Sequence, residues 1–249
     1  MKIGILQCDY VLERFQPTFG DYPNMIATLF AKISTDCQFK TYQVQTLEYP
    51  QCINECDAYI TTGSRHGVND DLVWINRLEK FICELDRVKK PFIGVCFGHQ
   101  LMTKALGGTV EKSDKGWGIG VTFNQVVDSK PWMEPCQDRL NLVASHQDQV
   151  TRLPQGVESN VLVSSPFCPY YMLMVDEHFI SIQGHPEFSK EYAAALINTR
   201  REIIPPECIH AGELSLQADV DDQLMARWIV NFITARMRYG QSETSKTCL

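Results

Sequence analysis

The strongest constraint on the fold is the alternation of two patterns in the first 108 residues. Short apolar runs typical of buried strands are separated by amphipathic segments typical of helices. We expect strands at residues 2–7, 39–45, 58–62 and 92–95, and helices that begin near Asp21, near Asp70 or Asp71, and directly after Val95. Strands and helices that alternate in this way form right-handed βαβ units. The sequence therefore predicts an open, mostly parallel sheet with helices on both faces.

The second half of the chain differs, because consecutive strand patterns follow one another with only turn residues between them. These strands are expected at 120–127, 140–145, 161–165, 171–175 and 179–182. Their short connections favour antiparallel pairing, which adds an antiparallel section to the sheet. Two helices at 190–203 and 217–238 close the chain, and the linker between them contains Pro205-Pro206 and Gly212. We predict one α/β domain over residues 1–239 and a polar C-terminal tail at 240–249.

Composition excludes several classes of protein. The 249 residues include 23 Lys and Arg against 30 Asp and Glu, a formal net charge of −7. This balance argues against nucleic acid and membrane surfaces as partners, since both attract clustered cations. No stretch approaches the ~20 apolar residues of a membrane-spanning helix, and the N-terminal apolar run is too short for a signal peptide.

Ten cysteines are scattered along the chain, so we expect reduced thiols and a cytoplasmic location. Cys52 and Cys56 lie close together with Glu55, but no second Cys or His pair completes a tetrahedral metal site. We therefore expect no metal and no other cofactor.

The most informative segment is Gly94-Val95-Cys96-Phe97-Gly98, which follows an apolar strand and begins a helix. Its G-x-C-x-G spacing is that of a nucleophile elbow with a cysteine in place of serine. Flanking glycines allow the strand to reverse sharply into the helix. Such a turn presents Cys96 at the carboxyl end of the sheet, where the helix dipole favours a thiolate and the N–H of Phe97 is free to bind an oxyanion. The alternative is a buried structural cysteine at a glycine-rich turn.

A catalytic cysteine needs a base, and six histidines are available. His185 follows the last predicted strand in Gly184-His185-Pro186-Glu187, where residues two apart project to the same side. Glu187 is therefore expected to contact the imidazole and to hold its tautomer. His146, at the end of another predicted strand, is the alternative base, whereas His99 is expected to pack within its helix.

These two segments together resemble the class I glutamine amidotransferase family, whose fold is flavodoxin-like and whose catalytic triad is Cys–His–Glu. The resemblance extends over about residues 2–238 and implies a triad of Cys96, His185 and Glu187. It also implies further site residues by their positions in the family's motifs. The oxyanion hole would consist of the N–H groups of Gly63 and Phe97, and the substrate-binding residues would include Gln100, Ser64 and His146. Arg65, beside the oxyanion loop, and Lys115 are candidates for binding a carboxylate beyond the scissile bond.

The resemblance implies cysteine-dependent hydrolysis of γ-glutamyl amide bonds in a small-molecule substrate, through a γ-glutamyl thioester on Cys96. It is closest to stand-alone members, including the γ-glutamyl peptidases of plants. The sequence lacks the G-x-x-x-x-G-K phosphate loop of a synthetase. If ammonia is the leaving group, the chain is a glutaminase subunit with a separate synthetase partner, whereas an amino acid or peptide would make it a γ-glutamyl peptidase. A non-catalytic binding or regulatory module with the same fold is the alternative from another class.

Overall fold

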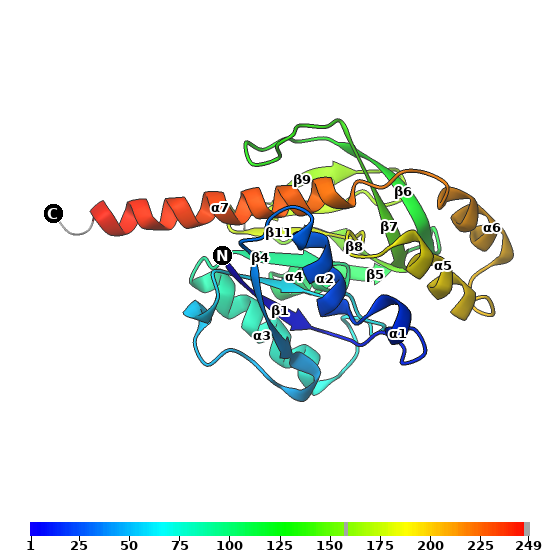
Figure 1. Cartoon of the computed structure of the whole chain (residues 1–249), viewed down its shortest axis with the longest axis horizontal. Helices are drawn as coiled ribbons and strands as arrows, with labels where there is room; N and C mark the ends of the chain where they lie inside the picture. Colours follow the sequence, from blue (N-terminus) through cyan, green and yellow to red (C-terminus); the bar gives the residue numbers. More distant parts are fainter. Residues whose placement is uncertain (157–158, 247–249) are drawn as a thin grey trace.

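The computed structural model describes residues 1–156 and 159–246, with side chains up to residue 238. Within these residues, the central feature is a nine-stranded sheet of order β2-β1-β3-β4-β11-β10-β9-β6-β7 (Figure 1). One half of it is parallel, as the alternation of strands and helices predicts. The parallel strands are β1 (Lys2–Gln7), β2 (Gln38–Gln43), β3 (Ala58–Thr61), β4 (Phe92–Val95) and β11 (Phe179–Ile182).

The other half of the sheet is antiparallel, which confirms the added antiparallel section. It contains β10 (Met172–Val175), β9 (Ser159–Ser164), β6 (Gly118–Val126) and β7 (Arg139–His146). Sequence patterns missed a separate two-stranded antiparallel sheet, formed by β5 (Thr109–Lys112) and β8 (Asp148–Arg152). Because β5 follows α4 and β8 follows β7, this pairing joins the segment after α4 to the segment after β7.

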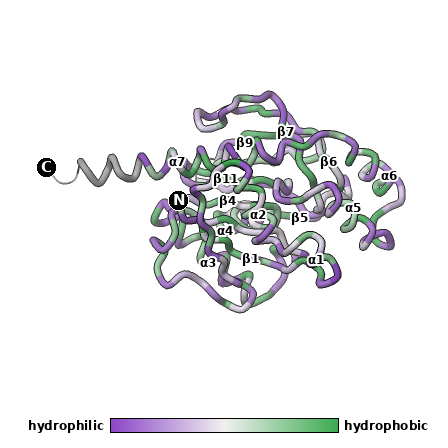
Figure 2. The backbone as a smooth tube through the Cα atoms, in the orientation of Figure 1, coloured by the Kyte–Doolittle hydropathy of each residue, from purple (hydrophilic) through white to green (hydrophobic). Residues whose placement is uncertain are grey.

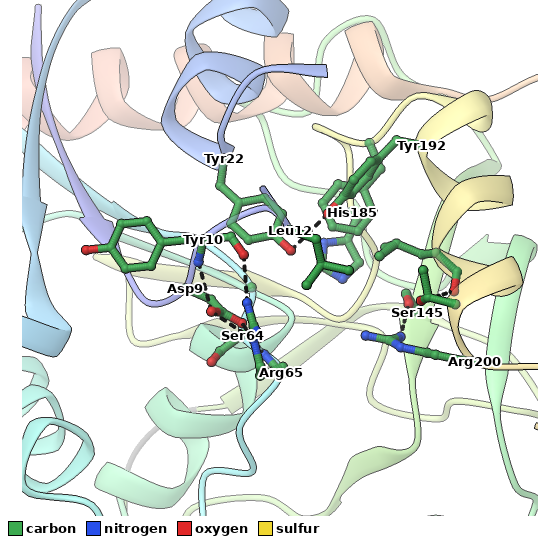
Figure 3. A pocket seen from close by; sticks show the side chains of 14 residues that line it. Asp9, Tyr10, Leu12, Tyr22, Ser64, Arg65, Ser145, His185, Tyr192 and Arg200 are labelled. Carbon is green, nitrogen blue, oxygen red and sulfur yellow. Dashed lines mark hydrogen bonds and ion pairs between the residues drawn. The ribbon is translucent and has the colours of Figure 1, made fainter. Parts of the chain in front are cut away.

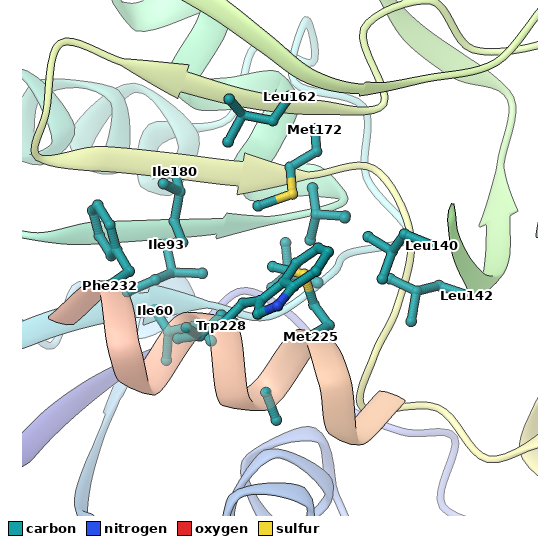
Figure 4. Close-up of a cluster of buried hydrophobic side chains, with 14 of the residues drawn as sticks. Ile60, Ile93, Leu140, Leu142, Leu162, Met172, Ile180, Met225, Trp228 and Phe232 are labelled. Atoms are coloured by element: carbon teal, nitrogen blue, oxygen red, sulfur yellow. The ribbon is translucent and has the colours of Figure 1, made fainter. Parts of the chain in front are cut away.

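Helices cover both faces of the parallel strands, as predicted (Figure 1). On one face lie α2 (Tyr22–Ala31) and α7 (Asp222–Lys246), and on the other lie α3 (Val73–Arg87) and α4 (Phe97–Ala105). The apolar stripe of α3 recurs every three or four residues, and that stripe is the side of the helix that is buried. Figure 4 shows the core under α7, where Met225, Trp228 and Phe232 pack against sheet residues that include Ile60, Ile93 and Ile180.

Hydropathy follows this layering. Hydrophobic residues gather along the central strands, whereas the loop between β6 and β7 is mainly hydrophilic (Figure 2). In the described ranges, no helix combines the length and the apolar character needed to cross a lipid bilayer.

The C-terminal part differs from the predicted pair of helices. Beyond α5 (Lys190–Thr199), the expected linker contains a further helix, α6 (Pro206–Ser215). Its two apparent helix breakers have other roles. Pro206 occupies the first helical position, where no backbone donor is needed, and a Cβ on Gly212 would lie 2.8 Å from Cγ1 of Ile119 on β6. The helix α7 also continues to Lys246, into the expected polar tail, of which residues 247–249 lie outside the described chain.

The remaining described helices are short. They are α1 (Gln16–Phe19) and two single turns of 3₁₀ helix, η1 (Val44–Thr46) and η2 (Ile53–Glu55).

Candidate active site

Cys96 lies at the apex of the turn between β4 and α4, with φ of 47° and ψ of −93°. Backbone strain at a residue other than glycine costs about 1–3 kcal/mol and persists only where the surrounding structure enforces it. Here two glycines allow close packing. A Cβ on Gly94 would lie 2.7 Å from the carbonyl oxygen of Gly98, and one on Gly98 would lie 1.7 Å from Oγ1 of Thr61 on β3. The G-x-C-x-G spacing therefore permits α4 to pack directly on two strands.

The register of the sheet brings the histidine segment to the elbow. Parallel pairing sets Val95 of β4 opposite Ile182 of β11, and the N–H of Cys96 donates to the carbonyl oxygen of Ile182 (2.8 Å). Just beyond β11, the N–H of His185 donates to the carbonyl oxygen of Val143 on β7 (2.8 Å). The backbone of His185 is thus anchored to the outermost strand, whereas the backbone of Cys96 is anchored at the centre of the sheet.

The imidazole of His185 is held on two sides. Its Nδ1 lies 2.8 Å from Oε1 of Glu187, and its ring stacks on Phe188 with a centroid separation of 3.9 Å and an interplanar angle of 8°. Both His185 and Glu187 are buried. Because a carboxylate only accepts, Nδ1 carries the proton and donates it to Glu187, which leaves Nε2 for proton exchange.

Burial and charge act in opposite directions on the pKa of His185. Burial lowers it, because a low dielectric disfavours the imidazolium. The charges and hydrogen bonds of Cys96 and Glu187 outweigh burial and raise this pKa to about 10. The arrangement therefore favours a cationic imidazole at neutral pH.

A chain of side-chain amides reaches the sulfur from the other side. Nε2 of Gln183 donates to Sγ of Cys96 across 3.5 Å. Gln100, expected to shape the substrate pocket, donates from Nε2 to Oε1 of Gln183 (3.1 Å) and to the carbonyl oxygen of Asp148 (2.7 Å). Gln183 was not predicted as a site residue, although it stands two residues before His185 in the same segment.

The two groups expected to bind an oxyanion lie on either side of the site. Gly63 is against the imidazole, since a Cβ there would lie 2.7 Å from Cε1 of His185. Phe97 is the first residue of α4, where backbone N–H groups have no partner within the helix. Neither N–H has an acceptor among the described residues.

The predicted substrate-binding residues have different environments. His146 is buried, both of its ring nitrogens lack a partner within the described chain, and burial lowers its pKa to about 3. Its imidazole is therefore neutral. Ser64 accepts a hydrogen bond at Oγ from the N–H of His66 (3.2 Å). Arg65 is already paired, because its Nε lies 2.8 Å from Oδ2 of Asp9.

Two cavities meet at this site. The first, of about 300 Å³, is lined by Cys96, Phe97, Gln100 and His146, and we call it the thiol cavity. The second, of about 180 Å³, is lined by His185, Tyr10, Tyr192 and Thr199, and we call it the imidazole cavity (Figure 3). Both cavities share four lining residues, which are Ser64, Arg65, Ser145 and Arg200.

One of the two cations at this junction, Arg200, was not predicted. Arg200 lies at the C-terminal end of α5 and lines both cavities. Lys115, in contrast, donates from Nζ to the carbonyl oxygens of Pro166 (2.7 Å) and Phe167 (3.4 Å) and lines neither cavity. No local sequence pattern marks Arg200, because only the fold brings the end of α5 to the elbow.

Comparison with known families agrees with this geometry. Residues 20–200 match the family model described as glutamine amidotransferase class-I. The chain belongs to this family. As a class-I glutamine amidotransferase family member, it carries the cysteine elbow directly after β4 and the His–Glu segment just after the neighbouring strand β11.

Individual relatives agree with this membership. The chain is 28% identical to γ-glutamyl peptidase 3 of Arabidopsis thaliana over 194 residues, 75% of this chain and 76% of that protein. It is 32% identical to one subunit of the glutamine-hydrolysing GMP synthase of Sulfolobus acidocaldarius over 139 residues, 54% of this chain and 69% of that protein. A glutamine amidotransferase structure from Thermotoga maritima superposes with a TM-score of 0.69 at 18% identity, covering 95% of this chain and 97% of that one. The predicted fold is thus confirmed, and the relatives support a glutamine amidotransferase-like hydrolase.

Proposed function

We propose that this protein hydrolyses γ-glutamyl amide bonds through a γ-glutamyl thioester on Cys96. The observation that carries the proposal is the contact of the His185 imidazole with Glu187 at 2.8 Å, on a ring whose raised pKa reflects the charge of the nearby Cys96. A thiol that only filled the core would not need a buried, carboxylate-oriented base beside it. Cys96, His185 and Glu187 are the proposed catalytic residues.

Acylation begins with attack of the Cys96 thiolate on the γ-carbonyl carbon of the substrate. The carbonyl oxygen becomes an oxyanion, which accepts hydrogen bonds from the N–H groups of Gly63 and Phe97. The imidazolium of His185 then donates its Nε2 proton to the amide nitrogen. The C–N bond breaks, the amine leaves, and the γ-glutamyl group remains on sulfur as a thioester.

Deacylation reverses these roles. Neutral His185 accepts a proton from water, and the resulting hydroxide attacks the thioester carbon. The C–S bond then breaks, which releases glutamate and restores the thiolate and the imidazolium. Glu187 keeps the imidazole oriented through both steps and stabilises its charged form.

The γ-glutamyl group of the substrate is proposed to occupy the thiol cavity. His146 lines this cavity with two unpartnered nitrogens, so it can both donate to and accept from the amino and carboxylate groups of a γ-glutamyl compound. Gln100 uses its own amide group on Gln183 and Asp148, so we assign it to the wall of the pocket and not to direct recognition.

A glutaminase subunit that supplies ammonia to a separate synthetase is the second candidate. The similarity to the GMP synthase chain of Sulfolobus acidocaldarius favours it, since that protein is named as one subunit of a glutamine-hydrolysing synthase. The two candidates share the chemistry at Cys96 and differ only in the leaving group.

Covalent capture tests the shared chemistry. An electrophilic glutamine analogue should add one γ-glutamyl-like group to wild-type protein, and mass spectrometry of peptides should find it on Cys96. Cys96→Ala should lose both capture and hydrolysis while keeping the fold, whereas Cys83→Ala, which removes an exposed thiol on α3, should keep both. Absence of capture would reject the enzyme and favour a non-catalytic module, whereas continued hydrolysis by Cys96→Ala would reject Cys96 as the nucleophile.

A further inference from the structure

The leaving group must lie on the imidazole side of the elbow. A general acid has to come within hydrogen-bond distance of the atom that it protonates. His185 lines the imidazole cavity, whereas Cys96 and Gln100 line the thiol cavity. If the γ-glutamyl group fills the thiol cavity, the departing amine therefore extends into the imidazole cavity (Figure 3).

That cavity is larger than ammonia requires. Its volume is about 180 Å³. A cavity needs only about 10–15 Å³ of such volume to hold one water molecule, and ammonia is of similar size. Space of this kind suits an amino acid or a small peptide as the leaving group.

Two arginines border the cavity, and their charges are compensated differently. Arg65 forms an ion pair with Asp9, and its Nη2 donates to the carbonyl oxygen of Tyr10 (2.9 Å). Arg200, by contrast, forms no ion pair with any carboxylate in the part of the chain that the structure describes. The junction of the two cavities therefore carries one uncompensated positive charge.

The guanidinium of Arg200 is held in place by contacts that leave other N–H donors available. Its Nη1 donates to Oγ of Ser145 (2.6 Å), and its Cζ lies 5.8 Å from the centroid of the Trp117 ring. A guanidinium has five N–H donors in a planar fork that matches a carboxylate. Figure 3 shows this side chain directed along the edge of the imidazole cavity, on the same side as Arg65.

We propose that Arg200 binds a carboxylate on the leaving group, so that the enzyme prefers γ-glutamyl amino acids and peptides with a free carboxylate over glutamine. This inference rests on the proposed function and names its substrate class. Arg200 acts here as a specificity-determining residue, and the chemical step still belongs to Cys96 and His185. Arg65 contributes to the same positive edge, but its charge is already paired with Asp9.

The test compares three substrates on the same enzyme: a γ-glutamyl amino acid, the same compound with its carboxylate converted to an amide, and glutamine. We expect wild-type kcat/KM to be highest for the free acid. In Arg200→Gln, kcat/KM for the free acid should fall about 10- to 100-fold, the range for one hydrogen bond to a charged group. Values for the amide and for glutamine should stay within about twofold, because neither offers the carboxylate.

Two further variants control for structure. Arg201→Gln removes the neighbouring charge at the same helix end, where Arg201 pairs with Glu213 away from the site, and it should leave all three substrates unchanged. Arg200→Lys keeps the charge without the fork and should lose selectivity only in part. Thermal unfolding of each variant shows whether a loss reflects folding.

The outcomes separate the inference from the proposed function. If wild type hydrolyses none of the three substrates, the proposed hydrolysis is wrong. If wild type hydrolyses them but Arg200→Gln loses activity equally on all three, Arg200 serves the γ-glutamyl group or the fold, and the leaving-group assignment is wrong. Preference of wild type for glutamine, or no effect of Arg200→Gln on the free acid, also overturns it.

Discussion

The side-chain amide of Gln183 donates to the sulfur of Cys96 across 3.5 Å, while Gln100 holds that amide from behind. Gln183 is completely buried, so this donor is shielded from bulk solvent. Hydrogen bonds to charged acceptors are stronger than those between neutral groups. A thiolate at Cys96 would therefore be stabilised by an uncharged donor, the Gln183 amide, as well as by the imidazole of His185.

Replacing this donor should slow the chemistry of the thiol. In Gln183→Leu, alkylation of Cys96 by iodoacetamide at neutral pH should slow by about tenfold, because the thiolate loses one hydrogen bond. The rate is measured by mass spectrometry of the Cys96 peptide. Gln125→Leu, on the exposed side of β6, should react like wild type. An unchanged rate in Gln183→Leu would mean that this contact does not stabilise the thiolate.

The carboxylate of Glu187 should control the pH range of activity. Its charge and its hydrogen bond help to raise the pKa of His185, so Glu187→Gln should lower that pKa. In the proposed mechanism the imidazolium donates the proton to the leaving amine, so the alkaline limb of kcat/KM should move to lower pH. Activity at neutral pH should also fall by about 100-fold. Glu191→Gln, at the exposed start of α5, is the matched control, and an unmoved alkaline limb in Glu187→Gln would contradict the assignment.

The same titration should make folding stability depend on pH. His185 titrates near its ordinary value of 6.5 in the unfolded chain and near 10 in the folded protein. Between these values the folded state keeps a proton that the unfolded state has lost. This contribution to the free energy of unfolding is therefore full below about pH 6.5 and is lost as pH rises through about 10. Urea unfolding across this range should show falling stability in wild type and a shallower fall in Glu187→Gln.

A side chain at position 63 should reduce the proposed hydrolytic activity. A Cβ there would lie 2.7 Å from Cε1 of His185, so Gly63→Ala should displace the imidazole. We expect kcat to fall by about 100-fold, since misplacement by about 1 Å has effects of that size. Gly156→Ala offers the opposite control. Its φ of +80° makes alanine strained there, but nothing lies within 4 Å, so stability should fall while kcat stays the same. Equal kcat in Gly63→Ala and wild type would show that the loop does not position the base.

Local sequence patterns predicted the parts of the site that are contiguous in the chain. The elbow at Cys96 needs glycines at fixed positions because α4 packs on β3 and β4, and five consecutive residues are enough to show this need. The contact between His185 and Glu187 was predicted from the two-residue repeat of an extended segment. In the structure Pro186 and Glu187 instead form a turn, in which the N–H of Phe188 donates to the carbonyl oxygen of His185 (3.5 Å), and this turn brings the carboxylate to the imidazole. Gln183 stands in the same segment, but nothing in that pattern tells a buried polar residue from one that faces the thiol.

Other features depend on contacts between distant segments and leave no local pattern. Arg200 reaches the junction of the cavities only because α5 packs beside β7, and no spacing relates it to Cys96. The helix α6 was missed because Pro206 and Gly212 are usual breakers, yet the proline begins the helix and the glycine allows close packing on β6. Two strands of the small sheet, β5 and β8, were also missed because their residues are largely polar.

The hydrogen bond from the backbone N–H of His185 to Val143 joins the proposed general base to β7, the strand at one border of the sheet. Cys96 and His185 thus depend on different parts of the sheet. Cys96 follows β4, a central strand, whereas His185 is hydrogen-bonded to β7, the strand at the border. A mutation in the β6–β7 hairpin that shifts β7 is therefore expected to displace the imidazole more than the sulfur.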